Sequence, residues 1–307
     1  MSPEDPYRTK ATPPEMFGKD GLFAPNAQVA FGLLWFEFLA ISPSYELARR
    51  YVEGEWTAED ERNRPADFDR VLEVYRDLGD VQRRLFRHWW LEKAFDLFGY
   101  QGEKPRVQGI AKIFRRKDGK PDLTDKAAKY IDGAWQQQGQ QRTMIVAIPA
   151  GLPKPQIFKQ IEKLLATYPD EKRVLRYKKP KYVLAGKRQD KHSLFRYLMV
   201  TWTRMKLPKE RLWRIGVLAN ISSTYSGRLQ PSDKPGHGEK TEDRAALKFL
   251  TNRAIYRGRM IAENAARGVF PSYAKCPHAV QPDWEEQYRM WVTRRKFQIA
   301  AKKQTST

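Results

Sequence analysis

Cysteine and histidine are scarce in this chain of 307 residues, and their scarcity excludes whole classes of structure and chemistry. The single cysteine, Cys276, cannot form an internal disulfide, which fits a reducing compartment. The four histidines include no pair at the i, i+4 spacing that places two ligands on one face of a helix. A tetrahedral zinc site needs four ligands, usually as two spaced pairs. We therefore expect neither a metal site nor a cofactor.

Long hydrophobic runs are also missing. The longest, Val29–Ile41, is interrupted by Glu37 and is shorter than the ~20 residues that a membrane-spanning helix needs, so it predicts a buried helix. The first residues contain no basic segment followed by an apolar one, so no secretory signal is predicted. We expect no membrane contact and a cytoplasmic location, on the nucleoid if the protein is bacterial.

Aromatic and basic residues are abundant. Hydrophobic residues make up 41% of the chain and aromatic residues 12%, which indicates a folded protein. Residues 1–100 carry 13 basic and 18 acidic side chains, a net charge of −5, whereas residues 101–307 carry 44 and 18, a net of +26. This uneven field favours a surface that faces a polyanion, and nucleic acid fits best because binding releases condensed counterions. The alternative is a solvated basic surface, or one that meets an acidic protein or a membrane.

The first third of the chain has helical periodicity after a polar, proline-rich start. We predict a flexible arm at residues 1–25 and an acidic helical domain at 26–100, with Ser42, Asp67 and Asp80 as helix caps. Its aromatic side chains, Trp89 and Trp90 among them, fit a core better than a platform for bases, since such platforms lie in positive grooves. This domain is expected to bind a partner, either a second copy or another protein.

Residues 101–190 predict a small basic α/β domain. Strands are expected at Val107–Phe114, Thr143–Ile148 and Lys181–Ala185, with a helix opened by Pro153 between the last two. The loop before that helix lacks the glycine spacing and the Lys-Ser/Thr pair of a nucleotide-binding loop, so nucleotide binding is not expected.

The densest positive stretch lies at the end of this domain. Between Lys172 and Lys191, nine of twenty residues are basic. Such side chains suit phosphate contacts, which position a protein without reading the base sequence. The alternative is an ordinary solvated surface. The predicted phosphate contacts are Lys178, Lys179, Lys181, Lys187, Arg188 and, further along the chain, Arg214.

A candidate DNA-reading motif follows at Leu212–Leu229, LWRIGVLANISSTYSGRL. The segment contains, in this order, an apolar residue, a tiny residue at a helix contact, a turn residue that tolerates positive φ, and a second apolar residue. These are Ile215, Gly216, Asn220 and Ile221, with Ala219 and Leu229 expected to point inward. The segment resembles helix-turn-helix DNA-binding proteins. It departs from their pattern at Ser226, where an aliphatic side chain is usual, and a rotation by one residue would bury Tyr225 instead.

The resemblance implies a supporting helix at Pro208–Leu218 and a recognition helix at Ser222–Leu229 in the major groove. Base contacts would come from Ser222, Ser223, Thr224 and Arg228, the last through a bidentate contact to guanine. Residues 191–307 would then be a helix-turn-helix-like DNA-binding domain with a basic tail. A long helix is expected after the motif, at Thr241–Arg267. The basic residues on its outer faces are Arg244, Lys248, Arg253, Arg257 and Arg259. The alternative for the motif is two short packed helices with no DNA role.

Enzyme signatures are not recognisable. Nothing arranges Arg196, Arg244, Arg257 and Tyr288 as a tyrosine recombinase would require, and acidic residues are thinnest in the basic region, where a metal-dependent nuclease needs them. No catalytic residue is predicted.

The sequence therefore predicts a mainly α fold with a small α/β segment, and a non-enzymatic, sequence-specific protein that binds double-stranded DNA. Its task would be transcriptional regulation, or replication or partition of a mobile element. Two alternatives remain: an RNA- or single-strand-binding component of a larger nucleoprotein assembly, and a DNA-processing enzyme whose site is not recognised.

Overall fold

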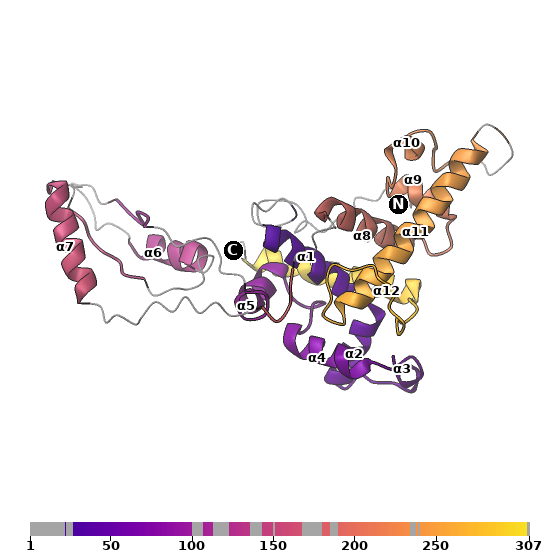
Figure 1. Cartoon of the computed structure of the whole chain (residues 1–307), viewed down its shortest axis with the longest axis horizontal. Coiled ribbons are helices and arrows are strands. Elements are labelled where there is room, and N and C mark those ends of the chain that lie inside the picture. Colours follow the sequence, from indigo (N-terminus) through magenta and orange to yellow (C-terminus); the bar gives the residue numbers. More distant parts are fainter. Residues whose placement is uncertain are drawn as a thin grey trace. The chain divides into compact units, whose positions relative to one another are not determined.

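Helices dominate the structure, a computed structural model that describes residues 22, 27–99, 107–112, 123–135, 143–149, 151–167, 180–184, 190–233, 238 and 240–305. Within these ranges there are helices and no β-strands (Figure 1). The chain divides into two compact units. The core unit is formed by residues 1–93 and 182–307, and the central unit by residues 94–181. The mainly α prediction is confirmed.

The predicted small α/β segment is not seen in the described residues. The described parts of the three expected strands, 107–112, 143–148 and 181–184, have no strand structure. A β-prone run becomes a strand only when a neighbouring strand satisfies its backbone groups, and no strand occurs among the described residues. Ile145 and Ile148 instead leave 64% and 52% of their surface exposed.

The helices of the central unit bury little. α6 (Thr124–Tyr130) continues into a π-helical turn at Ile131–Trp135, and α7 (Lys154–Ala166) follows the predicted proline start. Phe158 and Leu165 on α7 are 68% and 58% exposed. No described residue between 107 and 167 is buried. The described part of this stretch therefore has no hydrophobic core of its own.

Limited proteolysis with trypsin is expected to cut α7 before it cuts the core unit. Local opening is cheapest where few apolar contacts are buried, and Lys159 and Lys163 lie on a helix with no buried residue. Mass spectrometry of early time points would locate the cuts. First cuts after Lys248 or Arg253, on a helix packed into the core unit, would contradict this expectation.

α1 (Ala27–Ala40) forms the centre of the core unit, as the apolar run predicted. Every residue from 32 to 40 is buried. α2 (Pro43–Glu53) follows, and its predicted cap is confirmed because the Ser42 hydroxyl accepts a hydrogen bond from the Tyr45 backbone N–H. In the described parts of the chain no single helix has the length and apolarity to cross a membrane; α1 and α2 meet the criterion only jointly and are bent by 73°.

Three more helices follow: α3 (Ala58–Arg62), α4 (Phe68–Leu78) and α5 (Phe86–Phe98), of which α5 belongs to the core unit up to residue 93. Trp89 and Trp90 are 0% and 6% exposed, so the prediction that they lie in the core is confirmed. The predicted cap at Asp80 is wrong. Its carboxylate accepts from the backbone of Gln82 and Arg83, in a turn that precedes α5.

Asp67 is the second predicted cap that the structure corrects. It stands before α4 but makes no capping hydrogen bond. Its carboxylate instead binds Arg267, two hundred residues away, at 2.7 and 2.9 Å. Burial alone would raise the pKa of Asp67, but the hydrogen bonds and charge of Arg267 outweigh burial and lower it. Asp67 therefore stabilises the contact with a distant segment of the chain and does not cap α4.

Five helices form the last part of the chain: α8 (Lys191–Lys206), α9 (Leu212–Leu218), α10 (Ser223–Ser226), α11 (Thr241–Ala265) and α12 (Trp284–Thr305). α11 ends close to the predicted position, and Gly268 beyond it takes the left-handed φ of 78°. The basic segment at the end of the chain is helical over residues 284–305, and this helix buries Gln287, Arg294 and Gln298.

The two helical domains predicted from the sequence belong to one unit. The Trp35 indole donates to the Ala265 carbonyl at 3.3 Å, and the Gln287 amide donates to the Ile41 carbonyl at 2.8 Å. Both bonds join residues more than 200 positions apart. The acidic first hundred residues therefore support the helices that follow the basic stretch, and are not set apart from them.

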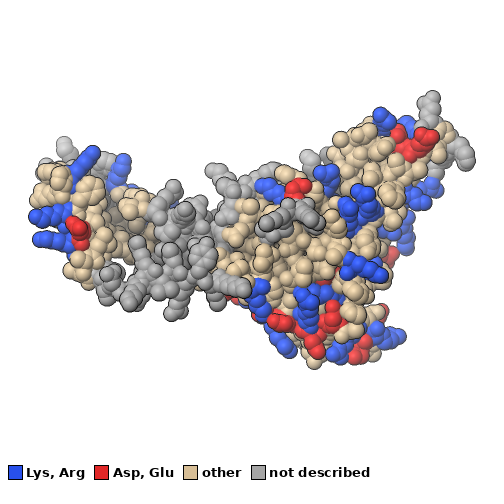
Figure 2. All heavy atoms as spheres, viewed as in Figure 1, with Lys and Arg blue, Asp and Glu red and all other residues tan. Residues whose placement is uncertain are grey.

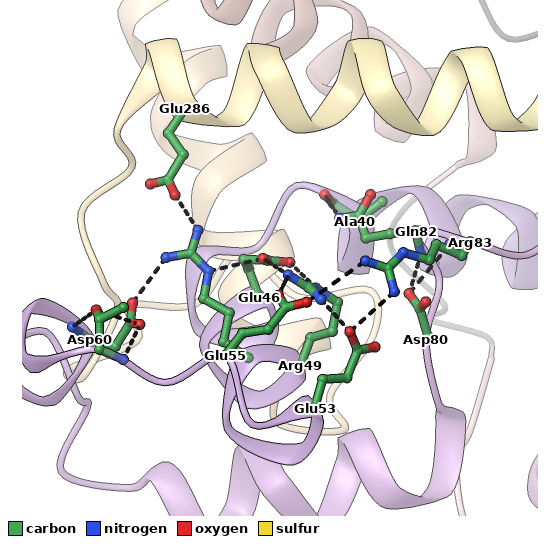
Figure 3. A network of polar contacts seen from close by, with 12 residues as sticks. Ala40, Glu46, Arg49, Glu53, Glu55, Asp60, Asp80, Gln82, Arg83 and Glu286 are labelled. Carbon is green, nitrogen blue, oxygen red and sulfur yellow. Dashed lines mark hydrogen bonds and ion pairs between the residues drawn. The ribbon is translucent and has the colours of Figure 1, made fainter.

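Ion pairs tie α2, α3 and α12 together at the surface (Figure 3). The guanidinium of Arg50 donates to Glu46 on its own helix, to Asp60 on α3 and to Glu286 on α12. Burial by itself would raise the pKa of Asp60, but the hydrogen bonds from Thr57 and the charge of Arg50 lower it. Basic side chains of the fold therefore neutralise part of the negative charge carried by residues 1–100.

Candidate nucleic-acid interface

The turn between α9 and α10 has the geometry that the motif predicted. Asn220 is the only described non-glycine residue with positive φ, at 47°. The Ile221 N–H donates to the Gly216 carbonyl at 3.1 Å, which closes the turn after α9. Asparagine takes this left-handed conformation at lower cost than most side chains.

The inward-pointing residues are also where the motif placed them. Ile215 and Ala219 join Val200 of α8 and Ala254 of α11 in one apolar cluster. Leu229 is fully buried in a second cluster, which also contains Trp213 of α9 and Leu247 of α11.

The departure at Ser226 is accommodated by a hydrogen bond. Its hydroxyl donates to the Gly216 carbonyl at 3.2 Å, so α10 meets α9 through a polar contact. Tyr225 beside it is partly buried and packs on the cluster of Trp213, Leu229 and Leu247. Tyr225 is therefore partly buried, as a rotation of the second helix by one residue would require.

Gly216 lies at a close contact between two helices, as the motif predicted. The helix that approaches it is α11, because a Cβ at this position would meet α11. It would lie 2.2 Å from Thr251 Oγ1 and 2.8 Å from Leu247 Cγ. The small residue thus permits the close approach of α9 and α11.

Replacing Gly216 by alanine is expected to destabilise the core unit by about 1–3 kcal/mol, the usual range for overpacking. Thr251 is fully buried and cannot swing into solvent. Urea denaturation followed by tryptophan fluorescence would measure the loss, and adding Thr251→Ala should restore part of it. Gly133→Ala is the matched control, since its Cβ would meet nothing within 4 Å. A Gly216→Ala protein as stable as that control would refute the packing argument.

Both helices of the motif are shorter than predicted. The supporting helix starts at Leu212 and not at Pro208, and the recognition helix is the single turn Ser223–Ser226 in place of Ser222–Leu229. Four residues rise only ~6 Å. Serine and threonine compete for backbone hydrogen bonds and favour helix ends, and the chain leaves the helix so that Leu229 can enter the core. Such a short element offers few side chains to a groove.

The predicted base-reading residues lie around this turn. Ser223 and Thr224 are exposed on α10, and Ser222 is half-buried at its start. Arg228 stands beyond the helix, with its side chain 63% exposed and Nη1 3.6 Å from an oxygen of Asp243. These side chains are close together, but Arg228 does not project from a recognition helix.

The predicted phosphate contacts are only partly described. Lys178, Lys179, Lys187 and Arg188 lie outside the described residues, while Lys181 is exposed. Arg214 is held by the fold. Its Nη1 lies 3.2 Å from Glu210, Nη2 donates to the Asp233 carbonyl at 3.3 Å, and Cζ lies 5.2 Å from the Trp213 ring centre. A phosphate would have to displace these contacts in order to bind the Arg214 guanidinium.

A more accessible cationic surface runs along α11. Lys248 and Arg253 are exposed, and neither forms an ion pair or side-chain hydrogen bond with the rest of the described chain. Between these two cations lies a stripe of exposed residues at helical spacing. We call the stripe and the two cations together the α11 outer face. The stripe consists of Ala245, Phe249, Asn252 and Tyr256. Its spacing was visible in the sequence, but the aromatic members were not recognised because apolar residues on a helix usually indicate a core.

Acidic residues are confined to the start of this helix. Glu242 and Asp243 occupy its first turn, and the next acidic residue is the buried Glu263. Residues 244–262 therefore contain basic but no acidic side chains. In Figure 2, Lys and Arg predominate where α11 runs, whereas both signs are mixed around α2, α3 and α4.

The remaining cations of α11 are engaged by the fold. Arg257 donates to the Tyr197 hydroxyl at 2.8 Å, and its Cζ lies 4.7 Å from the Tyr273 ring centre. Arg259 donates to the Ala279 carbonyl at 3.3 Å. These arginines add positive charge to the surface, while Lys248 and Arg253 are exposed and form no ion pair or side-chain hydrogen bond within the described chain.

No cluster of three histidine, cysteine, aspartate or glutamate side chains that could hold a metal occurs among the described residues. Cys276 is buried, and burial raises the pKa of its thiol. No protein-family model, curated protein or solved structure matches the chain.

Proposed function

We propose that this chain is a non-enzymatic protein that binds double-stranded DNA through Lys248 and Arg253 of the α11 outer face. The observation that carries the proposal is the pair of exposed cations Lys248 and Arg253, which form no ion pair with any described residue and lie on a helix stretch without acidic residues. Phosphate contacts of this kind supply most of the affinity for DNA and release counterions.

The dimensions of this surface suit a duplex. α11 has 25 residues and is thus ~37 Å long, and the major groove, about 12 Å wide, admits an α-helix. α10 packs against the side of α11 that carries Leu247, so the exposed Ser223, Thr224 and Arg228 lie beside the first half of the helix but not on its outer face. Transcriptional regulation, and replication or partition of a mobile element, are the tasks that fit such a protein.

Removing the two cations tests the proposal. For Lys248→Gln/Arg253→Gln we expect duplex affinity to fall roughly 10- to 100-fold at 0.1 M salt, and the slope of log K against log salt to shrink by about 2, as two phosphate contacts are lost. Fluorescence anisotropy on the whole chain over a range of salt concentrations measures both quantities.

The matched control removes two exposed arginines elsewhere in the core unit, Arg62→Gln/Arg76→Gln on α3 and α4. Its total charge is the same as that of the test variant, so equal losses in both would mean that only net charge matters. Unchanged affinity and slope in the test variant would exclude the α11 outer face. Preferential competition by structured RNA over duplex DNA would favour the RNA-binding alternative.

A further inference from the structure

Two large aromatic side chains on the α11 outer face have no packing role that explains their position. Phe249 is 63% exposed and Tyr256 is 48% exposed. They lie seven residues apart, two helical turns and ~10.5 Å along the axis, so both project from the same side. The opposite side of α11 supplies the core with Leu247, Thr251 and Ala254.

The surroundings of the two rings define what would cover them. Lys248 and Arg253 flank the stripe on either side, and Asn252 lies between the rings. An occupant must therefore offer flat apolar faces, polar edges and negative charge within one short span. Nucleobases on a phosphate backbone combine all three, and base–aromatic stacking beside a positive groove is the usual arrangement in proteins that bind single strands.

Fully paired DNA cannot use these rings, because each base face is already covered by its neighbour in the stack. We propose that Phe249 and Tyr256 stack on unpaired bases, so that α11 prefers DNA with an opened segment over the same DNA fully paired. This inference rests on the proposed DNA-binding function and names the form of DNA that the surface takes. The axial rise between the two positions equals about three base steps of ~3.4 Å, so each ring would receive its own base, with Asn252 lying between them in the helix.

The test compares three fluorescent DNAs of one sequence: a full duplex, a duplex with a central mismatched bubble, and a single strand. The whole chain should bind the bubble more tightly than the duplex. Phe249→Ala/Tyr256→Ala should lose that preference, by roughly 5- to 150-fold for each stacked base. Its duplex affinity and salt slope should stay at wild-type values, because the cations remain.

Two controls separate stacking from other effects. Phe158→Ala on α7 removes an equally exposed phenylalanine, 68% accessible, and should leave the preference intact. Phe249→Tyr/Tyr256→Phe keeps both rings and should also retain it. A 2-aminopurine base in the bubble should be quenched by the wild type and not by the alanine variant.

The outcomes distinguish this inference from the function on which it rests. Equal wild-type affinity for bubble and duplex, or a preference that survives the alanine variant, overturns the stacking inference and leaves duplex binding in place. Binding to the bubble and single strand alone supports stacking and overturns duplex binding. Absence of binding to every DNA overturns both. If the alanine variant changes only the oligomeric state, the stripe is a protein interface and the inference is wrong.

Discussion

An Arg294→Met substitution is expected to lower the free energy of unfolding of the core unit by about 3–5 kcal/mol, because it leaves a carboxylate buried without its counter-ion. The guanidinium of Arg294 binds both oxygens of Glu37 at 2.7 Å, and both side chains are almost completely buried. Its Nε also donates to the Val81 carbonyl at 3.0 Å, and its Cζ lies 4.9 Å from the Phe36 ring centre. One arginine thus joins α12 to the centre of α1.

Urea denaturation followed by tryptophan fluorescence would measure this loss. Arg289→Met, an exposed position on the same helix, is the matched control and should change stability by less than about 0.5 kcal/mol. The double variant Glu37→Leu/Arg294→Met should recover most of the loss, since apolar residues of similar volume can replace a buried pair. If Arg294→Met were as stable as Arg289→Met, α12 would not depend on this pair.

A Glu263→Ala substitution is expected to have an effect of similar size, about 3–5 kcal/mol. The Glu263 carboxylate is fully buried near the end of α11 and accepts hydrogen bonds from three segments of the chain. The donors and their distances are Ser42 Oγ at 2.8 Å, Ser44 N at 3.2 Å, Ser44 Oγ at 2.5 Å, Arg267 Nη1 at 3.0 Å and Val280 N at 3.1 Å. Alanine would leave these donors unsatisfied in a cavity.

Glu242→Ala, on the exposed first turn of α11, serves as the control for Glu263→Ala. Chemical denaturation at pH 7 should separate the two variants clearly, and a loss below about 1 kcal/mol in Glu263→Ala would contradict the argument. Arg267 keeps Asp67 as its partner in this variant. Because Arg267 lowers the pKa of Asp67, that contribution is present at neutral pH and is lost as the pH falls through the folded-state pKa.

Local signals in the sequence predicted several helix boundaries correctly. Ser42 caps α2, α11 ends close to its expected limit, and Asn220 forms the left-handed turn between α9 and α10. Each of these depends on the backbone preferences of one or two residues. Asp67 and Asp80 also precede helices, but their carboxylates bind other groups: Arg267 for Asp67, and the backbone of Gln82 and Arg83 for Asp80. The sequence alone does not show which of these donors a carboxylate will bind.

The candidate site was predicted in part. The cations of α11 were named from the sequence, because helical spacing separates an outer from an inner face. Which of them are free was decided by contacts with other helices: Arg257 binds Tyr197, whereas Lys248 and Arg253 bind nothing among the described residues. Phe249 and Tyr256 were missed, since an apolar residue on a helix has the same appearance whether it packs inward or faces solvent.

The sequence by itself determined the helical character, the buried α1 run and the left-handed turn at Asn220, because these follow from local periodicity and backbone preference. Only the tertiary structure decided that the acidic first part and the last helices share one core, through Glu37 with Arg294 and Asp67 with Arg267. Partners more than 190 positions apart leave no periodic trace in a single sequence. The unformed strands follow the same rule, because a strand exists only when a distant segment supplies the other half of its hydrogen bonds.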